Sequence, residues 1–255
     1  MQSRKNYKRI VIKIGSSIFA KGKNNLDTAL ISNIASQIYD LLKQNKEIIL
    51  VSSGAIALGM SILKLNNRPK DLEHLQATAA IGQHELMHVY KIALKKYSLN
   101  CAQLLLTWDD FREKRYLNAK QTLNTLLKLK CVPIINENDT VATEEIKFGD
   151  NDKLSALVSI LVDAQLLIIL SDVDGLLDKN KKVIRSVDRI TPGIKSLACP
   201  SSKKTCVGGM ITKLDAAQIA TSAGIPCVIA NGSKKGIIAK IATNPCSEGT
   251  IFLPK

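Results

Sequence analysis

The sequence predicts an α/β fold, a three-layer αβα sandwich around a mainly parallel central sheet. Short apolar runs alternate along the chain with longer segments of helical periodicity. Parallel strands are buried on both faces and therefore form continuous apolar runs, and the helices between them supply the crossover connections. Polar and glycine residues follow several of these runs, at the carboxyl ends where ligands bind in such sheets.

The elements follow from the spacing of apolar residues along the chain. The expected strands are the apolar runs at 9–15, 47–53, 101–107, 132–138, 165–172 and 225–232. Helices are expected at 27–44, 71–97, 115–130, 152–164 and 210–224, with a short helical piece after the second strand. Residues 178–207, rich in Lys, Ser and Pro, are expected to form a long excursion.

The length of 255 residues suits one large α/β domain, and we expect 1–255 to be a single domain. Its front part would be about residues 1–165 and its back part about residues 166–255. Because no apolar run approaches the roughly 20 residues that span a bilayer, no membrane partner is expected. Without a signal-type N-terminus, the expected location is the cytoplasm.

The charge balance is strongly basic, with 36 Lys and Arg against 22 Asp and Glu, a net charge of +14. The excess is mostly lysine spread along the chain, and aromatic residues make up only 4%, so few side chains can stack on bases. Nucleic acid is therefore not the expected partner, and a small polyanionic substrate suits the positive field better. The cysteines form no C-x-x-C pair and are expected to be free thiols.

Two lysines are candidates for catalysis. Lys13 lies inside the apolar run "IVIKIG", and charged side chains are seldom buried without a partner. Lys213 lies in the first turn of the helix that follows Gly208 and Gly209, where it can reach an anion. Asp152 could orient both ammonium groups without taking part in proton transfer. The structural alternatives are a solvated helix lysine for Lys213 and a helix cap for Asp152.

Glycine turns are the candidates for holding phosphate. Gly54 and the pair Gly208–Gly209 each precede a helix, where backbone N–H groups can approach an anion closely. The chain contains neither G-x-x-x-x-G-K-[ST] nor G-x-G-x-x-G, so it has no P-loop or Rossmann fingerprint. Phosphate would therefore be held by separated glycine turns.

A second group of polar residues suits a small amino acid. Asp139 would pair with an ammonium group, which argues for a substrate whose amine is free. Ser53, Asn151 and the backbone amide of Gly54 would bind carboxylate oxygens. The residue types therefore predict a zwitterion pocket beside the phosphate site.

The chain resembles the amino-acid kinase superfamily, and within it the glutamate 5-kinase family. The resemblance runs from about residue 8 to 253 and rests on motifs in the family's order: "VIKIGSS", "VSSGAIALGM", "VPIINENDTVA", "FGDNDKLSALVS", "LSDVDGL" and "GGMITKLDAA". It implies the carbamate-kinase-like fold and a phosphotransferase with a carboxyl acceptor. The expected reaction is ATP-dependent phosphorylation of the γ-carboxylate of L-glutamate to L-glutamyl 5-phosphate, the first step of proline biosynthesis.

The same resemblance implies roles for particular residues. Lys13 and Lys213 would stabilise the transferring phosphoryl group, Asp152 would organise them, and Ser53, Asp139 and Asn151 would hold glutamate. The nucleotide site would comprise Lys13, Ser171, Asp172, Val207, Gly208, Gly209, Met210, Ile211, Thr212 and Lys213. Mg²⁺ would be held mainly by the phosphates of ATP, with no dedicated protein metal site.

The chain departs from the family pattern at two points. Val207 stands where members often have Thr, so a phosphate-facing hydroxyl is expected to be missing. Many members continue into a C-terminal PUA domain, which is not expected here because the sequence stops at Lys255. Further expectations from the resemblance are feedback inhibition by proline, a homo-oligomer (dimer or tetramer) and handover of product to glutamyl-phosphate reductase.

Other functions remain open at this point. A kinase of aspartate, N-acetylglutamate or UMP would share the fold, although Asp139 disfavours the last two. From different classes, the alternatives are a non-catalytic sensor of nucleotide and amino acid, and an RNA-binding protein. The string "HELMH" at 84–88 has the spacing of two zinc ligands, His84 and His88, on one helix face. No third ligand at a known spacing accompanies it, and a subunit interface is the expected role of this face.

Overall fold

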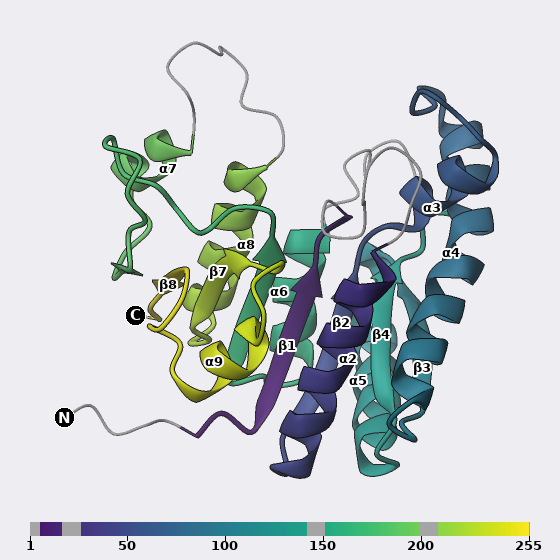
Figure 1. Ribbon diagram of the computed structural model, residues 1–255, viewed down its shortest axis with the longest axis horizontal. Helices are drawn as coiled ribbons and strands as arrows, with labels where there is room; N and C mark the ends of the chain where they lie inside the picture. The colour runs from purple at the N-terminus through teal and green to yellow at the C-terminus, as the bar shows by residue number, and fades with distance from the viewer. Residues whose placement is uncertain (1–5, 17–26, 142–150, 199–208, 255) are drawn as a thin grey trace.

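The computed structural model describes residues 6–16, 27–141, 151–198 and 209–254. Within these residues the strands form one eight-stranded sheet in the order β3-β4-β2-β1-β5-β7-β8-β6 (Figure 1). The strands are β1 (Arg9–Ile14), β2 (Glu47–Ser52), β3 (Cys101–Leu106), β4 (Val132–Glu137), β5 (Leu166–Ser171), β6 (Ser186–Val187), β7 (Cys227–Asn231) and β8 (Thr250–Phe252). All neighbouring pairs from β3 to β7 are parallel, and β8 runs antiparallel to β7.

Helices cover both faces of the sheet, which confirms the three-layer αβα sandwich. One apolar core lies between the sheet and α2 (Thr28–Lys43), α3 (Ala55–Ile62), α4 (Leu72–Lys95) and α9 (Ile237–Thr243). A second core lies on the opposite face beneath α5 (Glu113–Lys128), α6 (Asn151–Leu161) and α8 (Met210–Ser222). In Figure 1, α2 and α4 lie in front of the strands, with α5 and α6 behind them.

The expected strands and long helices are present, with shifts of a few residues at their ends. The structure adds the short elements η1 (Trp108–Phe111), α7 (Pro192–Leu197), α9, β6 and β8. Strand β6 has two residues and β8 has three, which is too short for a periodic pattern to appear in the sequence. The expected excursion at 178–207 contains β6 and α7, while its residues 199–207 lie outside the described residues.

Helices α3 and α4 approach each other unusually closely, at two glycines. A Cβ atom on Gly59 would lie 1.9 Å from the carbonyl oxygen of Thr78, and one on Gly82 would lie 1.8 Å from that of Ala55. Neither position can hold a larger residue unless the helix backbones separate. This contact brings the middle of α4 against the first turn of α3, immediately beside Gly54.

The sheet topology determines where a site can form. Strand β1 is central: the chain first builds β2, β3 and β4 on one side of it and then crosses to β5 on the other side. The carboxyl ends of these parallel strands lie at one edge, and ligands bind at such reversals of strand order. Residues that directly follow β1, β2, β4 and β5 therefore meet at this edge.

Candidate active site

Lys13 faces the second core because side chains alternate along β1. Ile12 and Ile14 pack in the core beneath α2 and α9, whereas Val11 packs in the core beneath α6 and α8. Lys13 shares the face of Val11, since side chains two residues apart point to the same side of a strand. The lysine therefore extends toward the first turns of α6 and α8.

Three charged side chains meet at that point. The Nζ atom of Lys13 lies 2.6 Å from Oδ1 of Asp152, and the Nζ atom of Lys213 lies 3.2 Å from Oδ2 of the same carboxylate. The three residues are 6%, 4% and 9% exposed in the order Lys13, Asp152 and Lys213. The structure thus brings together the predicted catalytic residues, with Asp152 between the two ammonium groups.

The electrostatics of Asp152 keep its carboxyl group ionised. Burial, the largest influence, raises its pKa, but the charges of Lys13 and Lys213 and hydrogen bonds from Lys13 and Thr212 together lower it below the ordinary 3.8. The cluster carries two positive charges against one negative charge. It therefore offers a net positive charge in a sheltered place, which suits a polyanionic ligand.

The start of α8 holds Lys213 in position. Gly209 precedes the helix with φ of 83°, a left-handed backbone conformation that glycine adopts without strain. Its carbonyl oxygen lies 3.2 Å from Nζ of Lys213 and 3.0 Å from the hydroxyl of Thr212, and that hydroxyl lies 2.9 Å from Oδ2 of Asp152. The N-terminus of a helix attracts anions, so this turn is suited to phosphate.

A chain of side-chain amides lies beside the charged cluster. The Nδ2 group of Asn151 donates to Oγ of Ser53 at 3.1 Å and to Oδ1 of Asn136 at 3.0 Å. The Nδ2 group of Asn136 in turn donates to Oε1 of Gln83 at 2.8 Å. Because Asn151 and Asp152 are adjacent at the start of α6, one helical turn joins the amide chain to the lysine cluster.

Gly54 and Asp139 are the remaining residues that the sequence predicts for an amino-acid pocket. Gly54 precedes α3 with φ of 115°, so the predicted glycine turn is present. Asp139 lies two residues beyond β4, and burial raises its pKa to about 6, although the nearby charge of Arg68 lowers it. A positive charge nearby favours the ionised form of a carboxyl group whose pKa is raised by burial.

The described residues predicted to bind nucleotide, apart from Lys13, lie at the C-terminal end of β5 and at the N-terminal start of α8. Ser171 is the last residue of β5, and its hydroxyl donates to Oδ1 of Asp172 at 2.9 Å. Gly209 and Thr212 adjoin the lysine cluster, and Met210 and Ile211 form the intervening first residues of α8. Val207 and Gly208 lie outside the described residues.

The structure adds residues that the sequence did not single out. Gln83 is a polar residue in the buried stripe of α4, and that misfit is the signal that could have revealed it. Beyond the end of β5, Asn231 donates to the carbonyl oxygen of Asp172 and to Asp174, at 3.4 and 3.1 Å, and Lys234 pairs with Asp174 at 3.0 Å. These residues brace the turn that follows β5.

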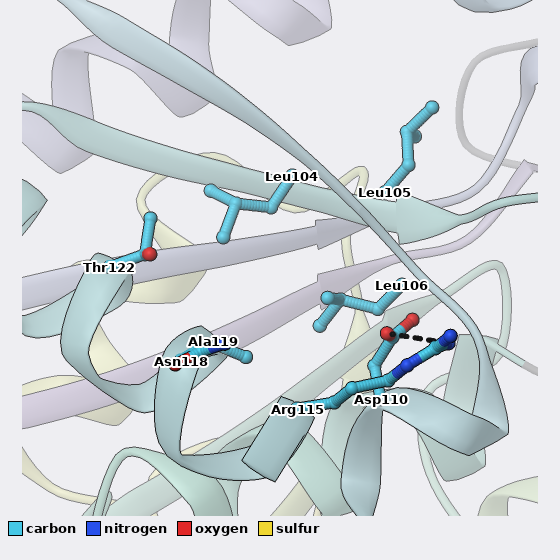
Figure 2. A pocket seen from close by; sticks show the side chains of 8 residues that line it. All are labelled: Leu104, Leu105, Leu106, Asp110, Arg115, Asn118, Ala119 and Thr122. Atoms are coloured by element: carbon cyan, nitrogen blue, oxygen red, sulfur yellow. Dashed lines mark ion pairs between the residues drawn. The ribbon is translucent and has the colours of Figure 1, made fainter.

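Two cavities lie away from this site. One, of about 330 Å³, lies between β3 and α5, where Asp110 and Arg115 form an ion pair of 3.6 Å (Figure 2). The other, of about 470 Å³, is lined by His84, Met87, His88, Lys91, Lys95, Leu99, Asn100 and Cys101. Neither cavity includes a predicted site residue.

Across the described part of the chain, no three His, Cys, Asp or Glu side chains lie close enough to hold a metal ion.

The fold and the site together define a class of protein. The chain belongs to the amino acid kinase family, whose sequence model matches residues 8–231. Within that family it is similar to proteins named glutamate 5-kinase. The one from Mesorhizobium japonicum is 47% identical, over 100% of this chain and 68% of its own length. The one from Clostridium acetobutylicum is 45% identical, over 98% of this chain and 96% of its own length. These relatives show that the chain belongs to the glutamate 5-kinase branch of the family.

A solved structure supports the fold independently. The crystal structure of N-acetylglutamate synthase from Neisseria gonorrhoeae, complexed with coenzyme A and L-arginine, matches with a TM-score of 0.71. The match covers 97% of this chain and 62% of that chain at 12% identity, so it shows a shared fold alone. No helix among the described residues is long and apolar enough to cross a membrane.

Proposed function

We propose that this protein is a glutamate 5-kinase, which transfers the γ-phosphoryl group of ATP to the γ-carboxylate of L-glutamate. The products are L-glutamyl 5-phosphate and ADP, and the reaction is the first step of proline biosynthesis. The observation that carries this proposal is the meeting of Lys13 and Lys213 on the buried carboxylate of Asp152. The family and its relatives named glutamate 5-kinase supply the substrate.

The chemistry requires positive charge more than proton transfer. A glutamate oxygen forms a bond to the γ-phosphorus while the bond from that phosphorus to the bridging oxygen of ADP breaks. The attacking carboxylate is already ionised near neutral pH, so no general base is needed. Lys13 and Lys213 stabilise the negative charge on the transferring group, and Asp152 holds both lysines in place.

The two substrates occupy opposite sides of the start of α6. Ser53, the amide of Gly54, Asp139 and Asn151 bind glutamate, with the carboxylate of Asp139 against its ammonium group. Ser171, Asp172 and the segment 207–213 bind the nucleotide. The front part, about residues 1–165, thus carries glutamate and the back part, about residues 166–255, carries ATP.

In this proposal Mg²⁺ would be held mainly by the phosphates of bound ATP. The carboxylate between the lysines, Asp152, is already engaged by two ammonium groups. This side-chain set fits an ion held mainly by phosphate oxygens, as Mg²⁺ commonly is. When bound, Mg²⁺ neutralises part of the phosphate charge, and the two lysines neutralise more of it.

Several wider features belong to the same proposal, on the strength of the family resemblance. They are feedback inhibition by proline, a homo-oligomeric state and handover of the labile acyl phosphate to glutamyl-phosphate reductase. A cytoplasmic location is also proposed. The cysteines 101, 131, 227 and 246 are free thiols, which suits a reducing compartment.

A hydroxylamine trap tests the function directly. The enzyme is incubated with ATP, Mg²⁺, hydroxylamine and one acid at a time: glutamate, aspartate, N-acetylglutamate or glutarate. Glutamate alone is expected to give strong hydroxamate signal, because Asp139 selects a free ammonium group and the relatives that share this chain's sequence are named glutamate 5-kinase. Equal signal from aspartate or N-acetylglutamate would contradict the substrate assignment, and no signal from any acid would contradict the reaction.

The pH dependence of glutamate binding tests the role of Asp139. Its pKa in the free protein is about 6, so protonation below that pH removes the negative charge that pairs with the substrate ammonium. The KM for glutamate is therefore expected to rise about tenfold per pH unit below pH 6 and to be level above pH 7. Asp139→Asn is expected to have a raised KM with little pH dependence across this range.

The raised pKa of Asp139 determines whether glutamate binding strengthens or weakens with pH. Because the folded pKa lies above the ordinary 3.8, the ionised carboxyl destabilises the free protein as the pH rises through about 6. A bound ammonium group offsets that cost, so binding strengthens with rising pH. A steep profile that persists unchanged in Asp139→Asn would assign the titration to another group. Asp109→Asn, at a carboxylate that is 70% exposed, serves as the control.

A further inference from the structure

Gln83 is a buried amide that the reaction described above does not use. It lies on the inner face of α4 among Ala79, Leu86 and Tyr90 and is 9% exposed. Its Oε1 atom accepts a hydrogen bond from Nδ2 of Asn136, whereas its own Nε2 atom is buried without a partner among the described residues. The residue therefore acts here as an acceptor only.

One backbone N–H determines how the whole amide chain is oriented. The N–H of Glu137 donates to Oδ1 of Asn136 at 2.9 Å, which identifies that end of the Asn136 amide as the oxygen. The Nδ2 end of Asn136 therefore points to Gln83, which must offer its oxygen there. The same Oδ1 atom lies 3.0 Å from Asn151, so Asn151 must turn its Nδ2 group toward it.

This orientation leaves a single oxygen of Asn151 available. Both hydrogens of its Nδ2 group are taken, one by Asn136 and one by Oγ of Ser53. Its Oδ1 atom is buried and has no hydrogen-bond partner among the described residues. A buried acceptor without a donor costs about 1–3 kcal/mol, so a ligand that donates a hydrogen bond is favoured there.

The arrangement differs from the expectation that Asn151 donates to a substrate carboxylate. An acceptor that lacks a partner suits an N–H donor, and the substrate ammonium is the strong donor of an amino acid. Asp139, whose carboxyl group is ionised at neutral pH, supplies the negative charge for the same group. Ser53 accepts from Asn151, which leaves the hydroxyl hydrogen of Ser53 to serve a carboxylate.

We propose that Gln83 is a positioning residue for substrate recognition, acting through Asn136 to hold the Oδ1 atom of Asn151 toward the substrate ammonium. This proposal rests on the proposed function, since it names how the same site recognises its amino acid. Helix α4 is well suited to the task, because its contact with α3 at Gly82 holds the neighbouring Gln83 at a fixed depth. Gln83 itself does not touch the substrate.

The test compares two substitutions at Gln83, one that removes the acceptor oxygen and one that keeps it. Gln83→Met keeps the approximate shape of the side chain but removes the oxygen that accepts from Asn136. The amide of Asn136 is then no longer held in one orientation, and the amide of Asn151 can rotate. The KM for glutamate is expected to rise about tenfold, the equivalent of one hydrogen bond to a charged group, with the KM for ATP within about twofold. Gln83→Glu retains an acceptor oxygen in either protonation state and replaces only the unpartnered Nε2 group, so it is expected to keep a nearly normal KM.

Glutarate separates positioning from a general structural effect. It has both carboxylates of glutamate but no ammonium group, so its inhibition constant against glutamate is expected to be unchanged in Gln83→Met. Gln121→Met, at an exposed glutamine of α5, is the matched control, and thermal unfolding of each variant checks that it is folded. Loss of glutarate binding in parallel with glutamate binding would overturn the proposal, as would a normal KM for glutamate in Gln83→Met.

Failure of the Gln83 proposal and failure of the proposed function give different results. If the wild-type protein phosphorylates a different free amino acid, the glutamate assignment fails. The same three variants are then compared with that substrate and its deaminated analogue. If Gln83→Glu is as impaired as Gln83→Met in a folded protein, the acceptor argument is wrong, whatever the substrate.

Discussion

Replacement of Lys213 by methionine is expected to lower kcat about 10³-fold, with a change of less than about threefold in the KM for glutamate. The Nζ atom of this residue lies 3.2 Å from Asp152 and 3.2 Å from the carbonyl oxygen of Gly209, so it is already in position before substrates bind. Its charge stabilises the phosphoryl group most when negative charge has spread over the transferring oxygens. Removal of that charge should therefore affect the transition state more than the bound substrates.

Steady-state kinetics with the hydroxamate assay or with ADP release measure this effect. Lys128→Met is the matched control, because Lys128 is an exposed lysine in the last turn of α5. Its kcat should stay within about twofold of the wild-type value, as is usual for surface substitutions. A normal kcat in Lys213→Met would remove this lysine from the mechanism. A loss confined to KM would instead make it a binding residue.

Replacement of Asp152 by asparagine is expected to lower the free energy of unfolding by about 3–5 kcal/mol. The change keeps the shape of the side chain but leaves Lys13 and Lys213 buried with no opposite charge between them. Both lysines are less than a tenth exposed, so water screens their repulsion poorly. Activity should fall as well, because the two ammonium groups are no longer held together.

Urea unfolding at neutral pH measures the change, with Asp163→Asn as the control. Asp163 pairs with Lys120 at 2.7 Å, but its side chain is 70% exposed, and such surface pairs contribute only about 0–1 kcal/mol. The pKa of Asp152 lies below 3.8, so its stabilising contribution is present above that pH and is lost as the pH falls through the lower folded value. The difference in the free energy of unfolding between the wild-type protein and Asp152→Asn should therefore narrow in that acid range. Equal stability at neutral pH would show that the lysines find other partners.

The core of the fold could be predicted from the sequence because its strands are buried on both faces. Runs such as 10–12 (IVI) and 166–170 (LLIIL) are continuously apolar, and that pattern identifies strands of a covered parallel sheet. The short strands β6 and β8 carry too few residues for any period. Strand β8 runs antiparallel to β7 and β6 pairs in parallel with β8, and both placements depend on tertiary contacts.

The site could be predicted in its parts but not in its connections. Lys13, Asp152 and Lys213 each stood out by residue type and by position at a strand or helix end. Gln83 did not, because its partner Asn136 lies 53 residues further along the chain. The zinc-like spacing of His84 and His88 did not lead to a predicted metal site, because the sequence offers no third ligand at a known spacing. It brings two histidines to one helix face, but the described residues supply no third ligand there.

The sequence by itself determined the layered fold and the edge at which the polar residues gather. The physical reason is that apolar periodicity and glycine turns act locally and need no knowledge of distant partners. Only the tertiary structure decided which side chains meet. Because β1 is buried on both faces, the side chain of Lys13 extends toward α6 and α8. There the carboxylate of Asp152 is its counter-charge. In the same way, one backbone N–H at Glu137 oriented three amides that lie far apart in the chain.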